Sequence, residues 1–173
     1  IHDSKVATEA LYQSKVELER VNRELFQFKA TLDLTLDCVL MNDPKTYKYF
    51  YANQGAVNQL GYTREEILEL TPHDLSPTLE MRDLSKIRQS LIEGKQAGAS
   101  IETEFRRKNG SFYPVEILLQ YIQFSSEEAR FIAIVRDISE RKQAEAKLHL
   151  AQFTFDNSPD AIEWINPDGK FIY

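Results

Sequence analysis

The sequence predicts an α+β domain in which helices cover one face of an antiparallel sheet, with a further helix on either side of the domain. Two observations lead to this prediction. Residues 101–136 contain three strand-like segments separated by turns, and the first alternates strictly between apolar and polar positions. Residues 37–94 contain two short strand patterns followed by three helical patterns with capping signals. The predicted order is therefore two strands, three helices, three strands and an exit helix.

The composition fits a globular domain with a charged surface. The 173 residues are 42% hydrophobic and 28% charged, and the net charge of −6 argues against a nucleic-acid partner or an anionic membrane surface. The single cysteine, Cys38, indicates a reducing compartment, so we expect a cytoplasmic location. No apolar run approaches the roughly 18 residues needed to cross a bilayer, so no membrane contact is expected within this sequence. The pattern begins and stops abruptly, which indicates an excerpt of a longer chain.

Residues 1–30 are predicted to form a helix, because they contain no Gly or Pro and many Glu, Lys, Arg and Gln. Apolar residues recur with a seven-residue period, which is typical of a helix that pairs with another helix. We expect a parallel coiled-coil homodimer whose seam includes Leu11, Leu18, Val21, Leu25 and Phe28. The alternative is an amphipathic helix that lies on the domain's own sheet, and different segments could do either.

Local capping signals predict the three helices between the strands. Asn53 is expected to N-cap the first helix. Thr63 and Glu66 have the spacing of a capping box, which opens the second. Ser76, which a proline follows, is predicted to N-cap a third helix that ends at Gly94.

The strand that ends the sheet is predicted to continue directly into the exit helix. Asn109-Gly110 predicts a type I′ turn earlier in the sheet, between the first two long strands. Asp137 or Ser139 can N-cap the exit helix, and Arg141 can pair with Asp137. Because a strand that feeds a helix can couple the two mechanically, we expect these three residues to form a signal-relay joint.

The second and third long strands are apolar on both faces, so both faces of the sheet are expected to be covered. The helices between the strands can cover one face. The N-terminal helix or a second subunit is expected to cover the other.

The chain also repeats itself with an offset of 123 residues, which predicts a tandem array in which a helix precedes each domain. Four residues recur with the same type: Thr31, Asp33, Asp37 and Pro44 correspond to Thr154, Asp156, Asp160 and Pro167. The predicted organisation is an N-terminal helix at 1–30, a complete domain at 31–139, a linker helix at 140–155 and the truncated start of a second domain at 156–173.

Four stretches resemble a PAS domain with its C-terminal PAC segment: YANQGAVNQLGYTREEILEL, TPHDLSP, FRRKNGSFYPVEI and IVRDISERKQAE. The tail FDNSPDAIEWINPDGKFIY resembles the start of another PAS domain. The resemblance implies a five-stranded antiparallel sheet in the order 2-1-5-4-3 with helices over one face. It also implies a signal-input module of a bacterial-type regulator, usually a sensor histidine kinase of a two-component system or a cyclic-di-GMP enzyme such as a diguanylate cyclase.

The resemblance further implies a small-molecule pocket between the sheet and the helices. Its expected lining is Leu60, Tyr62, Ile67, Leu75, Phe105, Ile117 and Ile134 or its neighbour. The alternative is that these apolar residues only fill the core. No cofactor is evident: covalent flavin is disfavoured because ELTPHDLSP lacks a cysteine and Cys38 lies on the first strand, where we expect it to be buried. Haem is disfavoured because residues 78–93 contain no histidine and His73 lies in a loop.

The sequence lacks the motifs of catalysis and of metal binding, including a glycine-rich phosphate loop and paired cysteines or histidines at ligand spacing. We therefore expect a non-catalytic fragment that dimerises and relays a conformational change to a downstream domain of the same chain. The alternatives are a sensor with an occupied pocket and a passive dimerisation spacer.

Overall fold

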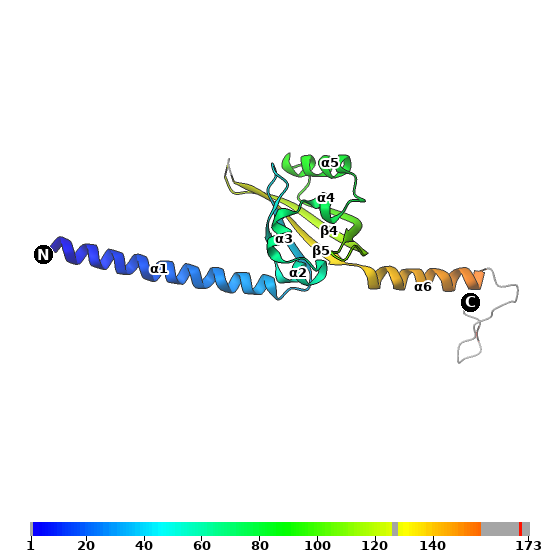
Figure 1. Ribbon diagram of the computed structural model, residues 1–173, viewed down its shortest axis with the longest axis horizontal. Helices are drawn as coiled ribbons and strands as arrows, with labels where there is room; N and C mark the ends of the chain where they lie inside the picture. Colours follow the sequence, from blue (N-terminus) through cyan, green and yellow to red (C-terminus); the bar gives the residue numbers. More distant parts are fainter. Residues whose placement is uncertain (1, 126–127, 157–169, 171–173) are drawn as a thin grey trace. The chain divides into compact units, whose positions relative to one another are not determined.

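A computed structural model describes residues 2–125, 128–156 and 170, and the chain divides into two compact units, Ile1–Arg136 and Asp137–Tyr173. The strands are β1 (Cys38–Asn42), β2 (Tyr49–Ala52), β3 (Ala99–Arg106), β4 (Phe112–Gln123) and β5 (Ala129–Asp137). The helices are α1 (His2–Asp33), α2 (Gln54–Leu60), α3 (Arg64–Glu69), α4 (Pro72–Leu75), α5 (Met81–Ile92) and α6 (Ser139–Asp156) (Figure 1). Apart from Asp156 and Lys170, the predicted second domain lies outside the described residues.

The five strands form one sheet in the order β2-β1-β5-β4-β3, which confirms the predicted α+β fold and strand order. β1 pairs antiparallel with both β2 and β5, and β3 pairs antiparallel with β4. The first strand thus lies between the second and the fifth. This arrangement places the end of β5 beside the start of β1.

The helices α2 to α5 cover one face of the sheet, where the alternation of the strands places the core (Figure 1). In β5, Phe131 and Val135 are buried on this face, opposite Asn42 and Cys38 of β1. On the other face, Leu118 is 43% exposed and Ile134 is 37% exposed. Within the described part of this single chain these residues stay partly exposed, and the covering of this face by a second subunit stays a prediction.

Two of the predicted caps form as expected. The Asn53 side chain accepts a hydrogen bond from the Ala56 backbone N–H, and Gly61 ends α2 with a positive φ of 76°. The hydroxyl of Thr63 accepts from the Glu66 N–H, and the Glu66 carboxylate accepts from the Thr63 N–H, which completes the capping box of α3.

The predicted start of the third helix was wrong. Ser76 ends a short helix, α4, whose capping box joins Thr71 and Asp74. The Ser76 side chain is buried and lies 2.9 Å from the hydroxyl of Thr103 on β3, so a tertiary contact takes the group that the sequence assigns to capping. The following helix, α5, begins five residues later, at Met81.

The predicted type I′ turn was also wrong. Such a turn needs a positive φ at both central residues, but only Gly110 has one, at 85°. The Gly110 N–H donates to the Arg107 carbonyl at 2.9 Å, so the tight turn lies one residue earlier and Gly110 follows it. The Asn109 carboxamide accepts from the backbone N–H and the hydroxyl of Ser111, which stabilises this alternative.

Candidate functional site

The side chain of Asn53 joins the end of α1 to the first strand and to α2. Its Nδ2 lies within 2.9–3.0 Å of three oxygens, the Leu32 carbonyl, the Thr35 hydroxyl and the Asp37 carbonyl. The last carbonyls of a helix have no partner within the helix, so this donor satisfies the end of α1. Its Oδ1 accepts at 2.9 Å from the backbone N–H groups of Val39 and Ala56. We call these residues, with Asn53 itself, the Asn53 junction.

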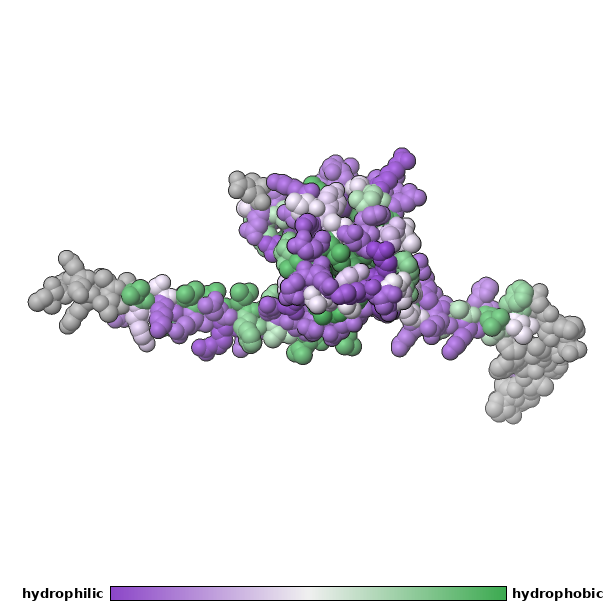
Figure 2. Space-filling model, viewed as in Figure 1, coloured by the Kyte–Doolittle hydropathy of each residue, from purple (hydrophilic) through white to green (hydrophobic). Residues whose placement is uncertain are grey.

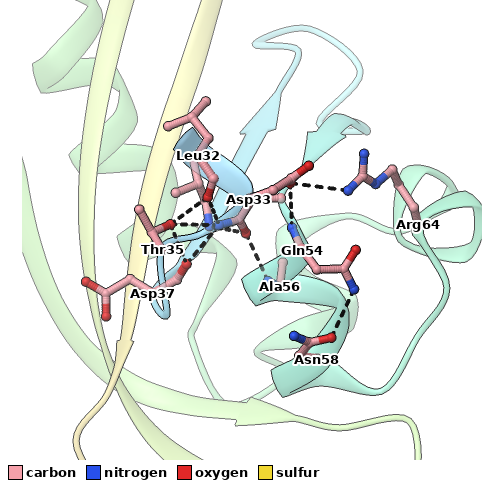
Figure 3. Close-up of polar contacts among 10 residues, drawn as sticks. Leu32, Asp33, Thr35, Asp37, Gln54, Ala56, Asn58 and Arg64 are labelled. Carbon is pink, nitrogen blue, oxygen red and sulfur yellow. Dashed lines mark hydrogen bonds and ion pairs between the residues drawn. The ribbon is translucent and has the colours of Figure 1, made fainter. Parts of the chain in front are cut away.

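A second contact strengthens the connection between α1 and the domain. The Asp33 carboxylate accepts from the Gln54 backbone N–H at 2.8 Å and lies 3.3 Å from the Arg64 guanidinium (Figure 3). Gly55 lets the chain come this close, because a Cβ at this position would lie 2.6 Å from the Asp37 carbonyl oxygen and 2.8 Å from that of Thr35. The end of α1 is therefore fixed to α2 and α3 by backbone and side-chain contacts.

Asp37 also links this junction to the end of the neighbouring strand β5. Its carbonyl accepts from Asn53, and its carboxylate pairs with Arg136 of β5 at 3.0 Å. The hydrogen bonds and charge of Asp37 raise the pKa of Arg136. The residue that precedes β1 thus contacts both the α1 connection and the last residues of β5.

A cavity of about 30 Å³ lies between the helices and the sheet. Its walls come from β1, β2, α4, α5, β3, β4 and β5 and from the turns after α4. Most of the lining side chains are apolar, and a few are polar. The lining residues are Asn42, Tyr49, Pro72, Ser76, Leu79, Leu84, Arg88, Ile101, Phe105, Ile117, Leu119 and Ala133. The volume of the cavity is close to that of one water molecule and well below the roughly 300–1,000 Å³ of small-molecule sites.

Arg88 is the charged group of this cavity and is 3% exposed. Its guanidinium carbon lies 4.2 Å from the ring centre of Tyr47 and 3.8 Å from that of Phe131. Burial lowers the pKa of Arg88 and raises that of the neighbouring Tyr49. No sequence motif pointed to Arg88, although its spacing from Leu84 and Leu91 places it on the apolar face of α5.

A family model for the PAS domain matches residues 36–140, which include Asn53, the cavity and the start of α6. The chain belongs to the PAS domain family. Sensor histidine kinases are among the proteins whose domains it resembles.

Two characterised relatives and one solved structure illustrate the similarity. The chain is 29% identical over 125 residues to the methyl sulfide methyltransferase-associated sensor of Methanosarcina acetivorans, covering 72% of this chain and 12% of that protein. It is 24% identical over 156 residues to the sensor histidine kinase TmoS of Ectopseudomonas mendocina, covering 87% and 16%. The PAS domain of an HTR-like protein from Haloarcula marismortui aligns with a TM-score of 0.60 at 24% identity, covering 72% of this chain and 99% of that one. The chain thus spans less than a fifth of the length of these two relatives.

The predicted pocket residues of the PAS domain separate into three groups. Phe105 and Ile117 line the cavity, and Ala133, the neighbour of Ile134, lines it from β5. Leu60, Ile67 and Leu75 are fully buried in the core but do not line the cavity. Two residues lie elsewhere: Tyr62 lines a surface hollow beside α2 and α3, and Ile134 lies on the partly exposed face of the sheet.

The predicted relay residues lie at the start of α6. The Asp137 carboxylate accepts from the Ser139 backbone N–H at 2.8 Å, so Asp137 provides the capping interaction and Ser139 is the first helical residue. Arg141 lies 4.0 Å from Glu145 of the same helix.

The predicted seam residues all lie on α1, where they are exposed in the single chain. Their exposed fractions range from 45% for Val21 to 72% for Leu11. Figure 2 shows hydrophobic side chains among hydrophilic ones along this helix. A row of apolar side chains in solvent on one helix is typical of an interaction surface.

Cys38 is fully buried on β1, with its sulfur 3.9 Å from the Gly55 carbonyl oxygen. His73 is part of α4, where sequence analysis expected a loop. In the described ranges, no group of three or more His, Cys, Asp or Glu side chains is arranged to hold a metal ion. Within those same ranges, every helix is too short or too polar to span a bilayer.

We predict that Asn53→Ala lowers the free energy of unfolding by about 3 kcal/mol, because it removes a helix cap and leaves the buried Val39 N–H without its acceptor. Asn58→Ala on the exposed side of α2 is the matched control and should change it by less than about 0.5 kcal/mol. Urea unfolding measures both. Equal effects of the two substitutions would contradict the role of the junction.

Asn53→Asp tests the hydrogen-bond donor of this side chain separately from its acceptor. It keeps the acceptor for Val39 and Ala56 but directs a carboxylate at the Leu32 and Asp37 carbonyl oxygens. Those oxygens raise the pKa of the introduced carboxyl in the folded state, so the variant should lose stability as the pH rises through that pKa. We expect its stability relative to the unsubstituted chain to improve on acidification, and a difference that is independent of pH would contradict this.

Proposed function

We propose that this PAS domain is a sensory input and signal-relay module that dimerises through α1 and passes a conformational change from its sheet to α6. The observation that carries the proposal is that β5 runs from the cavity to the start of α6. Phe131 of this strand contacts the guanidinium of Arg88, Ala133 lines the cavity, and Asp137 begins the connection to α6. A change at the cavity therefore reaches the exit helix within six residues of a single strand.

The contacts of Asp37 support a second route in the same module. Because Asp37 binds both Asn53 and Arg136, a displacement of the end of β5 is transmitted to the residues that fix α1. Long-range coupling of this kind needs a contiguous set of packed or hydrogen-bonded groups, and the two contacts of Asp37 supply one. The proposed output is a further domain of the same cytoplasmic chain, with a histidine kinase as the first choice because the relatives include one.

Dimerisation is proposed from the exposed apolar row on α1. A single helix that leaves Leu18, Leu25 and Phe28 in water gains free energy by burying them against a second copy. The partly exposed sheet face that carries Leu118 and Ile134 is a second apolar surface for the same partner.

The second candidate function is a sensor in which occupancy of the cavity drives the change. The cavity and its buried arginine favour it, and it is compatible with the relay. A passive dimerisation spacer is the outcome in which the helices pair but no substitution in the domain alters the output.

We predict that Leu18→Asp combined with Leu25→Asp converts a dimer of this chain to a monomer, as measured by light scattering. Each leucine contributes about 1.5–3 kcal/mol when buried, so the dissociation constant should rise by at least about 1,000-fold. Val16→Asp combined with Phe26→Asp is the matched control, because these exposed apolar residues lie on the same helix outside the seam. A control that dissociates the dimer equally would contradict the seam.

We predict that Asp137→Ala uncouples input from output in the full-length parent protein while the PAS domain stays folded. Loss of one capping interaction costs about 1 kcal/mol, which leaves a domain of ordinary stability intact. Lys147→Ala in the exposed middle of α6 is the control and should leave signalling unchanged. Normal signalling by the Asp137→Ala protein would refute the relay through this residue.

A further inference from the structure

Arg88 is a buried cation on the apolar face of α5. It lies between Leu84 and Leu91 on the side of the helix that packs against the sheet, and all three side chains are buried. Burial of an ionised side chain costs free energy unless neighbouring groups compensate it. Among the described residues, no carboxylate forms an ion pair with Arg88, so its compensation comes from other contacts.

The rings of Tyr47 and Phe131 supply part of this compensation. The guanidinium carbon lies 4.2 Å from the ring centre of Tyr47 and 3.8 Å from that of Phe131, which are distances of cation–π contacts. These contacts attract the charge but provide none of the oxygen acceptors that guanidinium N–H groups need. One nitrogen, Nη2, is buried and has no hydrogen-bond partner among the described residues. Arg88 therefore still needs an acceptor at this atom.

The cavity that Arg88 lines has the size of a single water molecule. Its volume is about 30 Å³. An internal water occupies roughly this share of volume and needs two to four polar partners. Cavities lined only by apolar groups stay dry, whereas this one is also lined by the polar side chains of Asn42, Tyr49 and Ser76. The size and the polar lining both match one water molecule.

Two of these side chains have oxygen atoms that can accept from a water. Asn42 donates through Nδ2 to the Tyr47 carbonyl at 3.3 Å, and its Oδ1 is an acceptor. The Ser76 hydroxyl lies 2.9 Å from that of Thr103, and a hydroxyl oxygen has two lone pairs. A water that accepts from Arg88 has two hydrogens to donate, so it complements both the cation and these oxygens.

We propose that the cavity holds one structural water molecule, which accepts a hydrogen bond from Nη2 of Arg88 and donates to oxygen atoms among Asn42, Tyr49 and Ser76. It connects α5 to β1, β2 and the end of α4, to which those three residues belong. Such a water is a constituent of the folded domain rather than a signal, because the volume is far below that of a metabolite site. The inference therefore does not rest on the proposed function.

The test observes the methyl groups of Ile101 and Ile117, which line the cavity, by nuclear magnetic resonance. A water held in the interior gives neighbouring methyl groups nuclear Overhauser effects of the sign that belongs to a slowly tumbling molecule, whereas surface water exchanges too fast to do so. We expect such effects from water to both methyl groups in the purified chain. Their absence would overturn the proposal.

Arg88→Met removes the donor while keeping an unbranched side chain of similar length, and we expect the effects to be lost because the water loses its charged partner. Arg82→Met, on the exposed side of the same helix, is the matched control and should keep them. Both variants retain the hydroxyl groups of Tyr49 and Ser76. Effects that persist in a folded Arg88→Met protein would therefore come from those hydroxyl protons and refute the assignment.

A crystal structure of the unsubstituted chain keeps the proposal falsifiable if Arg88→Met fails to fold. Crystals soaked in sodium bromide distinguish a water from a halide ion, which also suits a cation, because only bromide gives an anomalous signal at its absorption edge. The expected result is density in the cavity within hydrogen-bond distance of Nη2 and without anomalous signal. An anomalous peak at that place, or a cavity without density, would contradict the structural water.

Discussion

The carboxamide of Asn53 is the contact on which the connection between α1 and the PAS domain depends. One side chain, fully buried, satisfies the end of α1 through its nitrogen and the starts of β1 and α2 through its oxygen. Neither half could be replaced by a chemically simpler group, since the three surrounding oxygens need a donor and the two N–H groups need an acceptor. Gly55 completes the constraint, because a larger residue would push α2 away from these carbonyls.

The Asn53 junction also reaches the end of β5. Asp37 belongs to the Asn53 junction through its backbone and to the end of β5 through its carboxylate. The interior of the domain reaches the same strand through Phe131, which lies against the buried charge of Arg88. A buried charge whose compensation is incomplete is a sensitive element, because any group that completes it changes the energy of the folded state by an appreciable amount.

Local sequence signals predicted the features that depend on a few consecutive residues. The caps at Asn53 and Thr63 are of this kind. The strand order is not local, and its prediction came from the resemblance to the PAS family. Apart from the turn at Asn109-Gly110, the errors arose where a distant residue decides. Ser76 was expected to cap a helix, but Thr103, 27 residues later, lies against its hydroxyl. Arg88 was not singled out from the sequence, since its burial depends on the rings of Tyr47 and Phe131. The donor half of Asn53 was equally hidden, because its acceptors come from the end of α1 and from the loop that follows it.

Native-state amide hydrogen exchange tests most directly whether the Asn53 junction makes α1, β1 and α2 one cooperative unit. The backbone N–H groups of Val39 and Ala56 both donate to the Asn53 oxygen, whereas those of Lys45 and Thr46 donate to Asp43 in an exposed loop. If the junction holds the unit together, Val39 and Ala56 exchange only through global unfolding, with the full free energy of unfolding of the domain. Exchange of Val39 and Ala56 through local opening, at the rates of Lys45 and Thr46, would contradict the account.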